Sequence, residues 1–366
     1  MIEPTIRLFD LDGRLIWEGR RPARVEILAR FGAEEASALV AFHPRASLPE
    51  VALGDPMEIR FNGIRKFVGK VSELRRDSSG FPLSLQGARR PRRLYRHEVR
   101  GLFENQTPTE TLSTILAPIS GPKPSYSGLP GSTRVLDRLD FQGLPLFYAV
   151  DLLAKLAGNW LWWIDWEENL HFIPPSDPVE HVWRFDPDRM VLHPWERDRT
   201  IKNLFRLHGG VRNGEEFERF FESPESRERF GSVDETLFAR PITTEGPFAH
   251  LREAVLEEAP WPTDYRAVDR YDGDLTAGFG ERFELRGAEL PPGLNAGATF
   301  RIAAEELVWT EGGMRARYHV AEGLESASRY TRYIDHEPRD ENYVAARLGA
   351  FTLDLSVLDS EAHLDP

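Results

Sequence analysis

Residues 143–173 read GLPLFYAVDLLAKLAGNWLWWIDWEENLHFI, and they join a helical pattern to a strand pattern without a break. Apolar residues recur at helical spacing from 144 to 157, and Gly158 is a residue type that commonly ends a helix. Residues 160–173 then follow a Trp-rich strand, a turn at 167–169 and a returning strand. The stretch predicts a helix over 143–158 that leads directly into a β-hairpin, within a small α+β unit.

The Trp-rich strand has apolar residues on both of its faces. Trp160, Trp162 and Trp166 share one parity along the strand, whereas Leu161 and Trp163 have the other. An exposed aromatic cluster of this kind can bind carbohydrate. Because both parities are apolar, we favour a strand that packs between a helix and a neighbouring sheet. We therefore expect Trp160, Trp162 and Trp166 to be buried on one strand face.

A second helix is predicted upstream, over residues 107–120. Thr107, Pro108 and Glu110 form a capping box with proline at the first helical position. Four apolar residues follow at helical spacing and define one buried face: Leu112, Ile115, Leu116 and Ile119. The α+β unit therefore contains at least two helices and one hairpin.

The sequence on both sides of this unit has the pattern of short β-strands. Before it, strands are separated by the turn signals Asp12-Gly13, Asn62-Gly63 and Ser79-Gly80, which predicts a sandwich or barrel. After it, residues 181–323 are again β, with one helix near 247–258. Residues 297–323 resemble residues 54–87 in their order of strand, turn and strand, which suggests an internal repeat.

Composition limits the classes of function. The 366 residues carry a net charge of −13, which argues against stable binding of nucleic acid. The chain has no cysteine, which excludes disulfides, zinc–thiolate sites and thiol nucleophiles. No apolar run approaches the roughly 20 residues of a membrane helix, and the N-terminus lacks the pattern of a secretory signal, so we expect a soluble protein without membrane insertion.

Two segments differ from their surroundings. Residues 89–100 contain six arginines. A phosphate-binding patch is one interpretation, but in an acidic chain we favour a connector whose arginines pair with carboxylates.

At the C-terminus, a polar linker at 335–342 precedes an alternating apolar strand of Phe351, Leu353, Leu355 and Val357. This pattern predicts an arm over 339–366 that docks on another protomer or on a partner protein.

The usual catalytic and ligand-binding motifs are missing. There is no nucleophile elbow, zinc-protease helix, Walker loop or dinucleotide fingerprint. Asp10 and Asp12 start like a calcium loop but lack its closing Glu, and Asp335, His336 and Glu337 point in different directions along a linker. A pair of carboxylates for glycoside hydrolysis is brought together by tertiary geometry, so the sequence alone neither identifies nor excludes one. The Glu- and Arg-rich residues 214–231 most simply form exposed ion pairs. We therefore assign no catalytic residue, no cofactor and no metal site.

The order of these segments resembles the tail-hub, or baseplate hub, proteins of long-tailed phages and related contractile injection systems. The pieces most similar to that family are QTPTETLSTILA (106–117), residues 141–174, the strand NLFRLHGG (203–210) and SRERFG (226–231). The resemblance covers roughly residues 1–330 and depends on order and pattern. The C-terminal extension has no matching motif, and no fused lysozyme, peptidase or spike domain is seen.

The resemblance implies a mainly β fold with an α+β insert. Two tail-tube-like β-barrels, at 1–95 and 181–330, would flank the insert at 96–180, with a C-terminal extension at 331–366. Family members form homotrimers, whose paired barrels make a pseudo-sixfold ring that joins the tail tube to a threefold spike or fibre and lets the genome pass. The implied partners are other copies of the chain, the tail tube or distal tail protein, the tape measure protein, and the spike or tail-fibre protein, at the distal end of the virion tail.

Two other functions remain open. One is a distal tail protein, which forms a hexameric ring from a barrel and an appended module. The other belongs to a different class: a tail-associated hydrolase or binder of cell-wall glycan, using the Trp160–Trp166 cluster and acidic loops. The two-barrel order favours the hub, which would be a structural protein and not an enzyme.

Overall fold

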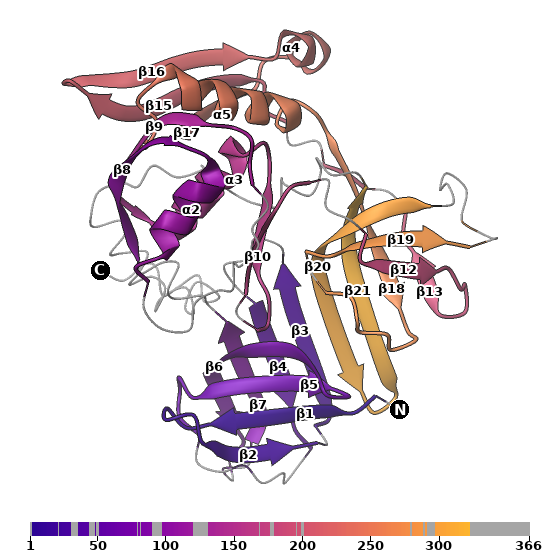
Figure 1. Ribbon diagram of the computed structural model, residues 1–366. Helices are drawn as coiled ribbons and strands as arrows, with labels where there is room; N and C mark the ends of the chain where they lie inside the picture. The colour runs from indigo at the N-terminus through magenta and orange to yellow at the C-terminus, as the bar shows by residue number, and fades with distance from the viewer. Residues whose placement is uncertain are drawn as a thin grey trace.

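The computed structural model describes residues 2–322 except 21, 31–35, 44–47, 49–50, 79, 81, 90–96, 120–130, 168, 176–178, 195, 199–200, 279, 288–289 and 291–296. The fold is mainly β with an α+β insert, as predicted. The predicted C-terminal arm at 339–366 and its linker lie outside the described residues. Figure 1 shows a β body below and to the right, with the insert and further helices above and to the left.

The first β unit contains strands β1 to β7. They are β1 (Pro4–Phe9), β2 (Leu15–Gly19), β3 (Arg24–Arg30), β4 (Ala36–Ala41), β5 (Pro56–Phe61), β6 (Ile64–Arg76) and β7 (Pro82–Arg89). In the sheet they lie in the order β3-β4-β7-β6-β5-β1-β2. The predicted Asn62-Gly63 turn joins β5 to β6, and both of its residues have positive φ, 48° and 85°, as a type I′ hairpin requires.

The second β unit is formed by strands from the later part of the chain. They are β12 (His181–Arg184), β13 (Met190–Leu192), β14 (Glu196–Asp198), β18 (Thr263–Arg270), β19 (Arg282–Arg286), β20 (Ala298–Thr310) and β21 (Gly313–Glu322). Strand β18 pairs with β13 and β14 on one side and with β21 on the other, and β21 pairs with β20, which pairs with β19.

The two β units share an order of pairing. Strands β4, β7, β6 and β5 are neighbours in that order and antiparallel. Strands β18, β21, β20 and β19 repeat this order and the antiparallel sense. At the far end the units differ, since β1 is antiparallel to β5 whereas β12 is parallel to β19. The similarity between 54–87 and 297–323 corresponds to this common arrangement of hairpins β6–β7 and β20–β21.

One strand pair joins the two units into a continuous 14-stranded sheet among the described residues. Residues 304–310 of β20 pair antiparallel with residues 24–30 of β3. Across Figure 1 the sheet runs from β6 and β4 on the left, through β3 and β20, to β18 and β13 on the right. The backbone groups along this junction are therefore paired within one hydrogen-bonded sheet.

The insert contains the helices and hairpin that the sequence predicts. Its elements are β8 (Glu98–Gln106), α2 (Pro108–Leu116), β9 (Leu136–Pro145), α3 (Leu146–Leu156), β10 (Leu161–Ile164) and β11 (Leu170–Ile173). The capping box at Thr107 is complete, because its hydroxyl accepts from the Glu110 amide and the Glu110 carboxylate accepts from the Thr107 amide. Helix α3 begins three residues later than predicted, because β9 continues to Pro145.

Residues 204–258 depart from the predicted boundary between the insert and the second barrel. We assigned them to a barrel over 181–330, but they form a separate three-stranded sheet and two helices. These are β15 (Leu204–Arg212), β16 (Glu215–Glu222), α4 (Pro224–Phe230), β17 (Asp234–Phe238) and α5 (Glu245–Glu258). They share a hydrophobic core with the insert, because Phe205, Phe221 and Leu251 belong to the same buried cluster as the residues of α3. A local β pattern does not reveal which core a strand joins.

The Trp-rich hairpin lies between the two hydrophobic cores. Trp160 and Trp162 belong to the core of the insert, whereas Leu161, Trp163 and Trp166 belong to the core of the β body. The prediction that the three tryptophans are buried is confirmed, at 7%, 2% and 6% exposure for Trp160, Trp162 and Trp166. The prediction of a single face was wrong for Trp166, because the strand ends at Ile164 and the turn redirects the chain.

Candidate assembly surface

The junction between the two β units is held by a buried ion pair. The Lys66 ammonium of β6 donates to the Glu305 carboxylate of β20 at 2.8 Å and to the Ala277 carbonyl at 2.9 Å. Both side chains are almost completely buried. Burial raises the pKa of Glu305, and the neighbouring Lys66 opposes that rise. Lys66 thus connects three segments that are distant in sequence, which fixes the second unit against the first.

The Trp-rich hairpin also contacts this junction. The Trp163 ring occupies the space beside Gly280, where a β-carbon would lie within 2.4 Å of it. Gly280 also has a φ of +88°, which favours glycine. Both the Trp163 ring and the backbone conformation therefore exclude a side chain at this position. Trp166 packs on Phe67 of β6, with ring centroids 5.9 Å apart. The hairpin therefore anchors the insert to both β units.

The sheet edge at β13 is fixed by a group of charged side chains. Asp269 of β18 accepts two hydrogen bonds from Arg317 of β21, at 2.7 and 2.9 Å, and lies 3.0 Å from the His193 imidazole that follows β13. Burial raises the pKa of Asp269, but the hydrogen bonds from Arg317 and His193 outweigh burial, so its pKa lies below the usual value. The charged form of Asp269 therefore stabilises the folded state.

The stability of this edge should depend on pH in acid. Because the pKa of Asp269 is lowered on folding, its contribution is present above the unfolded value of about 3.9 and is lost as pH falls through the folded pKa. We expect Asp269→Asn to reduce the loss of unfolding free energy below about pH 4. Urea titrations at pH 7, 4 and 3 measure this, with Asp12→Asn in an exposed turn as the control. Equal acid slopes for both variants would contradict the assignment.

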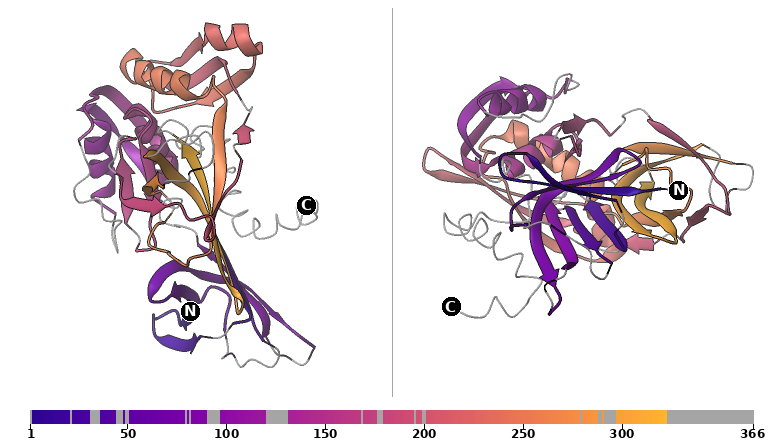
Figure 2. Two further views of the ribbon diagram at one scale, coloured as in Figure 1. Left: turned by 90° about the vertical axis from the view of Figure 1, so that its right-hand side faces the viewer. Right: turned by 90° about the horizontal axis from the view of Figure 1, so that it is seen from below.

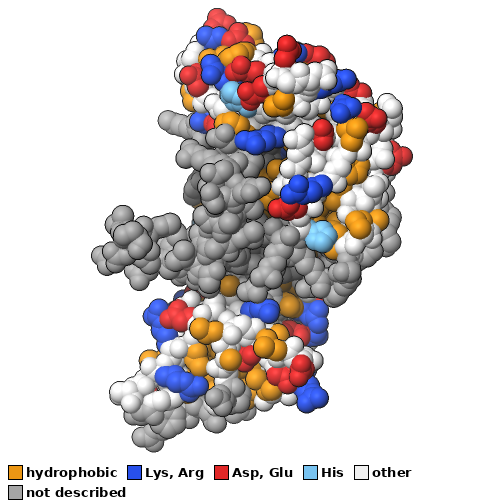
Figure 3. Space-filling model, turned by 90° about the vertical axis from the view of Figure 1, so that its left-hand side faces the viewer, with side chains coloured by type: hydrophobic (Ala, Val, Ile, Leu, Met, Phe, Trp, Pro, Cys, Tyr) orange, Lys and Arg blue, Asp and Glu red, His pale blue; other side chains and the backbone are white. Residues whose placement is uncertain are grey.

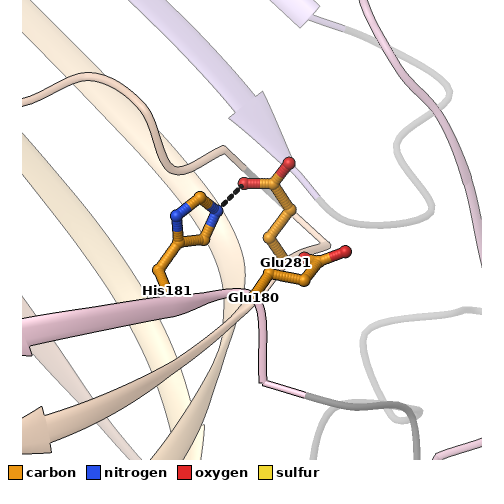
Figure 4. Close-up of side chains that lie close together, drawn as sticks. All are labelled: Glu180, His181 and Glu281. Atoms are coloured by element: carbon orange, nitrogen blue, oxygen red, sulfur yellow. Dashed lines mark hydrogen bonds and ion pairs between the residues drawn. The ribbon is translucent and has the colours of Figure 1, made fainter.

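One group of side chains has the composition of a metal site. Glu180, His181 and Glu281 offer ligand atoms that lie within 4.8 Å of one another (Figure 4). The His181 imidazole is 2.8 Å from the Glu281 carboxylate, which also accepts from the Gly278 amide at 2.8 Å. These hydrogen bonds account for the orientation of His181 and Glu281, so the geometry does not require a cation. The sequence analysis missed this group, because β12 and β19 meet only in the folded chain.

The remaining sequence candidates are explained by local structure. Asp10 accepts hydrogen bonds from the Asp12 and Arg14 amides, at 3.0 and 2.8 Å, and so forms the predicted hairpin turn. The Glu- and Arg-rich residues 214–231 include the predicted exposed ion pairs, such as Arg227 with Glu222. Asp335, His336 and Glu337 lie outside the described residues, as do 90–96 of the Arg-rich segment, whose Arg100 pairs with Glu98.

Solved structures with the same arrangement identify the fold. The 43 kDa tail protein of prophage MuSo2 from Shewanella oneidensis is 15% identical, with a TM-score of 0.59, over 88% of this chain and 99% of that one. The tail protein from Neisseria meningitidis MC58 is 15% identical, with a TM-score of 0.58, over 91% and 99%. The chain has a phage tail-protein fold. The sequence matches no protein-family model and no curated protein.

The surface of this tail-protein fold carries mixed charge on the face that Figure 3 shows. Acidic and basic side chains intermingle over its described parts, with scattered hydrophobic residues between them. None of the described helices is long and apolar enough to span a membrane. The tryptophans proposed as a glycan platform are buried, so they do not form one in this conformation.

Proposed function

We propose that this chain is a structural tail-tip or baseplate hub protein of a phage or a related injection machine. The observation that carries the proposal is the repeated strand order, which gives one chain two similar β units joined edge to edge. In our proposal each unit acts as a tail-tube-type barrel, the first within 1–95 and the second within 181–330 with residues 204–258 as an insertion. The shared fold with prophage tail proteins supports this assignment.

In this role three copies form a ring of pseudo-sixfold symmetry. A ring of this kind matches the sixfold tail tube on one side and a threefold spike or fibre on the other, and lets the genome pass. Its partners would be the tail tube or distal tail protein, the tape measure protein, and the spike or fibre protein. The proposed site of action is the distal end of the virion tail. The net charge of −13 supports passage of DNA, because an acidic channel does not retain it.

The oligomeric state tests this function. We expect native mass spectrometry and light scattering of the full chain, with and without its tail partners, to give a homotrimer. A hexamer would instead support a distal tail protein, and a chain that stays monomeric even with its partners would contradict the hub. Zymography on cell walls tests the third class, because clearing of the gel by the purified chain would show a glycan hydrolase.

A further inference from the structure

The strands β6 and β20 have the same construction. Each has 13 residues, and each has a one-residue bulge against its hairpin partner. Strand β6 also has a second register shift, between Arg75 and Arg76, where one residue of β7 is left unpaired. The bulge in β6 lies between Val71 and Glu73, and the bulge in β20 lies between Ile302 and Ala304. Aligning the two bulges makes residues 73–76 of β6 equivalent to residues 304–307 of β20. The comparison therefore has a defined register.

The two strands differ in whether another strand pairs with their second halves. On the side away from β21, β20 pairs first with β19 and then, beyond the bulge, with β3 of the other unit. On the side away from β7, β6 pairs with β5 as far as Lys70, and Val71 exchanges hydrogen bonds with Gly54 and Asp55. Beyond the bulge, no described strand pairs with β6 on that side. Arg75 and Arg76 there are exposed.

The strand equivalent to β3 in the second unit is β14. In the first unit, residues that are paired across neighbouring strands form a row perpendicular to the strands: Leu28, Ser37, Ala88 and Lys70. In the second unit the corresponding row runs Glu196, Tyr265, Ala321, Arg301. Lys70 and Arg301 each lie two residues before the bulge, so Leu28 and Glu196 occupy equivalent places. Within the described chain, β14 pairs with β18 alone.

We infer that residues 73–76 of β6 pair with β14 of a second copy of this chain. The template is the junction between β20 and β3 within one chain, where Glu306 lies opposite Leu28. Transferring that register places Arg75 of one protomer opposite Glu196 of its partner, with the strands antiparallel. The inference rests on the proposed ring and names the sheet edges that close it.

The positions of the two edges suit a ring. In Figure 1, β6 lies at the left of the β body, and β18, whose outer edge pairs with β13 and β14, lies at its right. The left view of Figure 2 shows the same body from the side, with the first unit at the lower end and the insert above. A head-to-tail contact between different edges closes into a ring when the rotation fits. Pairing would also satisfy backbone groups that an open edge leaves to water.

A disulfide tests the register directly, because the chain has no cysteine of its own. Opposite residues of antiparallel strands have Cα atoms about 4.5–5.5 Å apart, which a disulfide can bridge. We expect Arg75→Cys/Glu196→Cys to form a covalent trimer under mild oxidation, resolved on a non-reducing gel. A mixture of the two single variants should stop at a covalent dimer. Glu73→Cys/Asp198→Cys, two residues along the same edge, is a second variant.

Two controls make the outcome decisive. Leu28→Cys/Glu306→Cys should close a disulfide within one chain, because these residues are opposite at the template junction. Arg75→Cys/Val191→Cys should not cross-link, because Val191 pairs with Asp269, four residues or about 13 Å from the row of Glu196. A trimer by native mass without the covalent trimer, while the template control closes, would overturn the edge pairing alone. A monomer would overturn the ring and the pairing together.

Discussion

Lys66→Met should destabilise the fold by about 3–5 kcal/mol, the usual cost of removing one partner of a buried ion pair. The substitution keeps most of the unbranched side chain but leaves the Glu305 carboxylate in the core without its ammonium. It also removes the donor to the Ala277 carbonyl, and with it a bond between the first unit and the loop before β19. Equilibrium unfolding in urea measures the change. Lys70→Met, at an exposed position of the same strand, should stay within about 0.5 kcal/mol.

The pH dependence of this variant separates charge from packing. Burial already raises the pKa of Glu305, and loss of Lys66 should raise it further. A carboxyl with a raised folded pKa destabilises the protein above that pKa, so the penalty should shrink as pH falls and Glu305 is protonated. We expect a smaller difference from the native protein at pH 5 than at pH 8. A penalty that does not change with pH, or a double variant Lys66→Met/Glu305→Met no more stable than the single one, would indicate a packing effect instead.

Trp162→Ala should cost about 3–5 kcal/mol as a truncation of a buried aromatic side chain. The indole packs edge-on against Phe147 of α3, with ring centroids 5.2 Å apart, and its N–H donates to the Asp151 carboxylate of the same helix. Both residues are buried, so the variant opens a cavity and removes a hydrogen bond in the core of the insert. Trp162→Phe keeps most of the apolar volume and should lose less. Unfolding monitored by circular dichroism measures both variants.

A truncation at an exposed aromatic residue is the matched control for Trp162. Phe220 of β16 is 61% exposed and lies under the Arg206 guanidinium, 4.7 Å from its ring centroid. Phe220→Ala should therefore change the free energy of unfolding by less than about 1 kcal/mol. If Trp162→Ala left stability intact and abolished binding to cell-wall glycan, the Trp-rich hairpin would be a carbohydrate platform and its structural assignment would be wrong.

Elements with a strong local pattern could be predicted from the sequence. The capping box at Thr107 defines the start of α2, and the Asn62-Gly63 turn defines the hairpin of β5 and β6, because both depend on residues that are close in sequence. The burial of Trp160, Trp162 and Trp166 followed from apolar residues on both faces of one strand. The short helix α4 was not predicted, since its seven residues are mostly charged and show no apolar face.

The sequence by itself therefore determined the mainly β class, the α+β insert, and the buried Trp-rich hairpin at its boundary. Only the tertiary structure decided that residues 204–258 join the core of the insert, that Trp166 turns to the other core, and that β3 pairs with β20. It also brought Lys66 to Glu305, and His181 to Glu281, from segments far apart in the chain. The reason is physical: hairpins and caps are stabilised by neighbours in sequence, whereas the partner of a sheet edge or a buried charge is selected by long-range packing, which local periodicity does not encode.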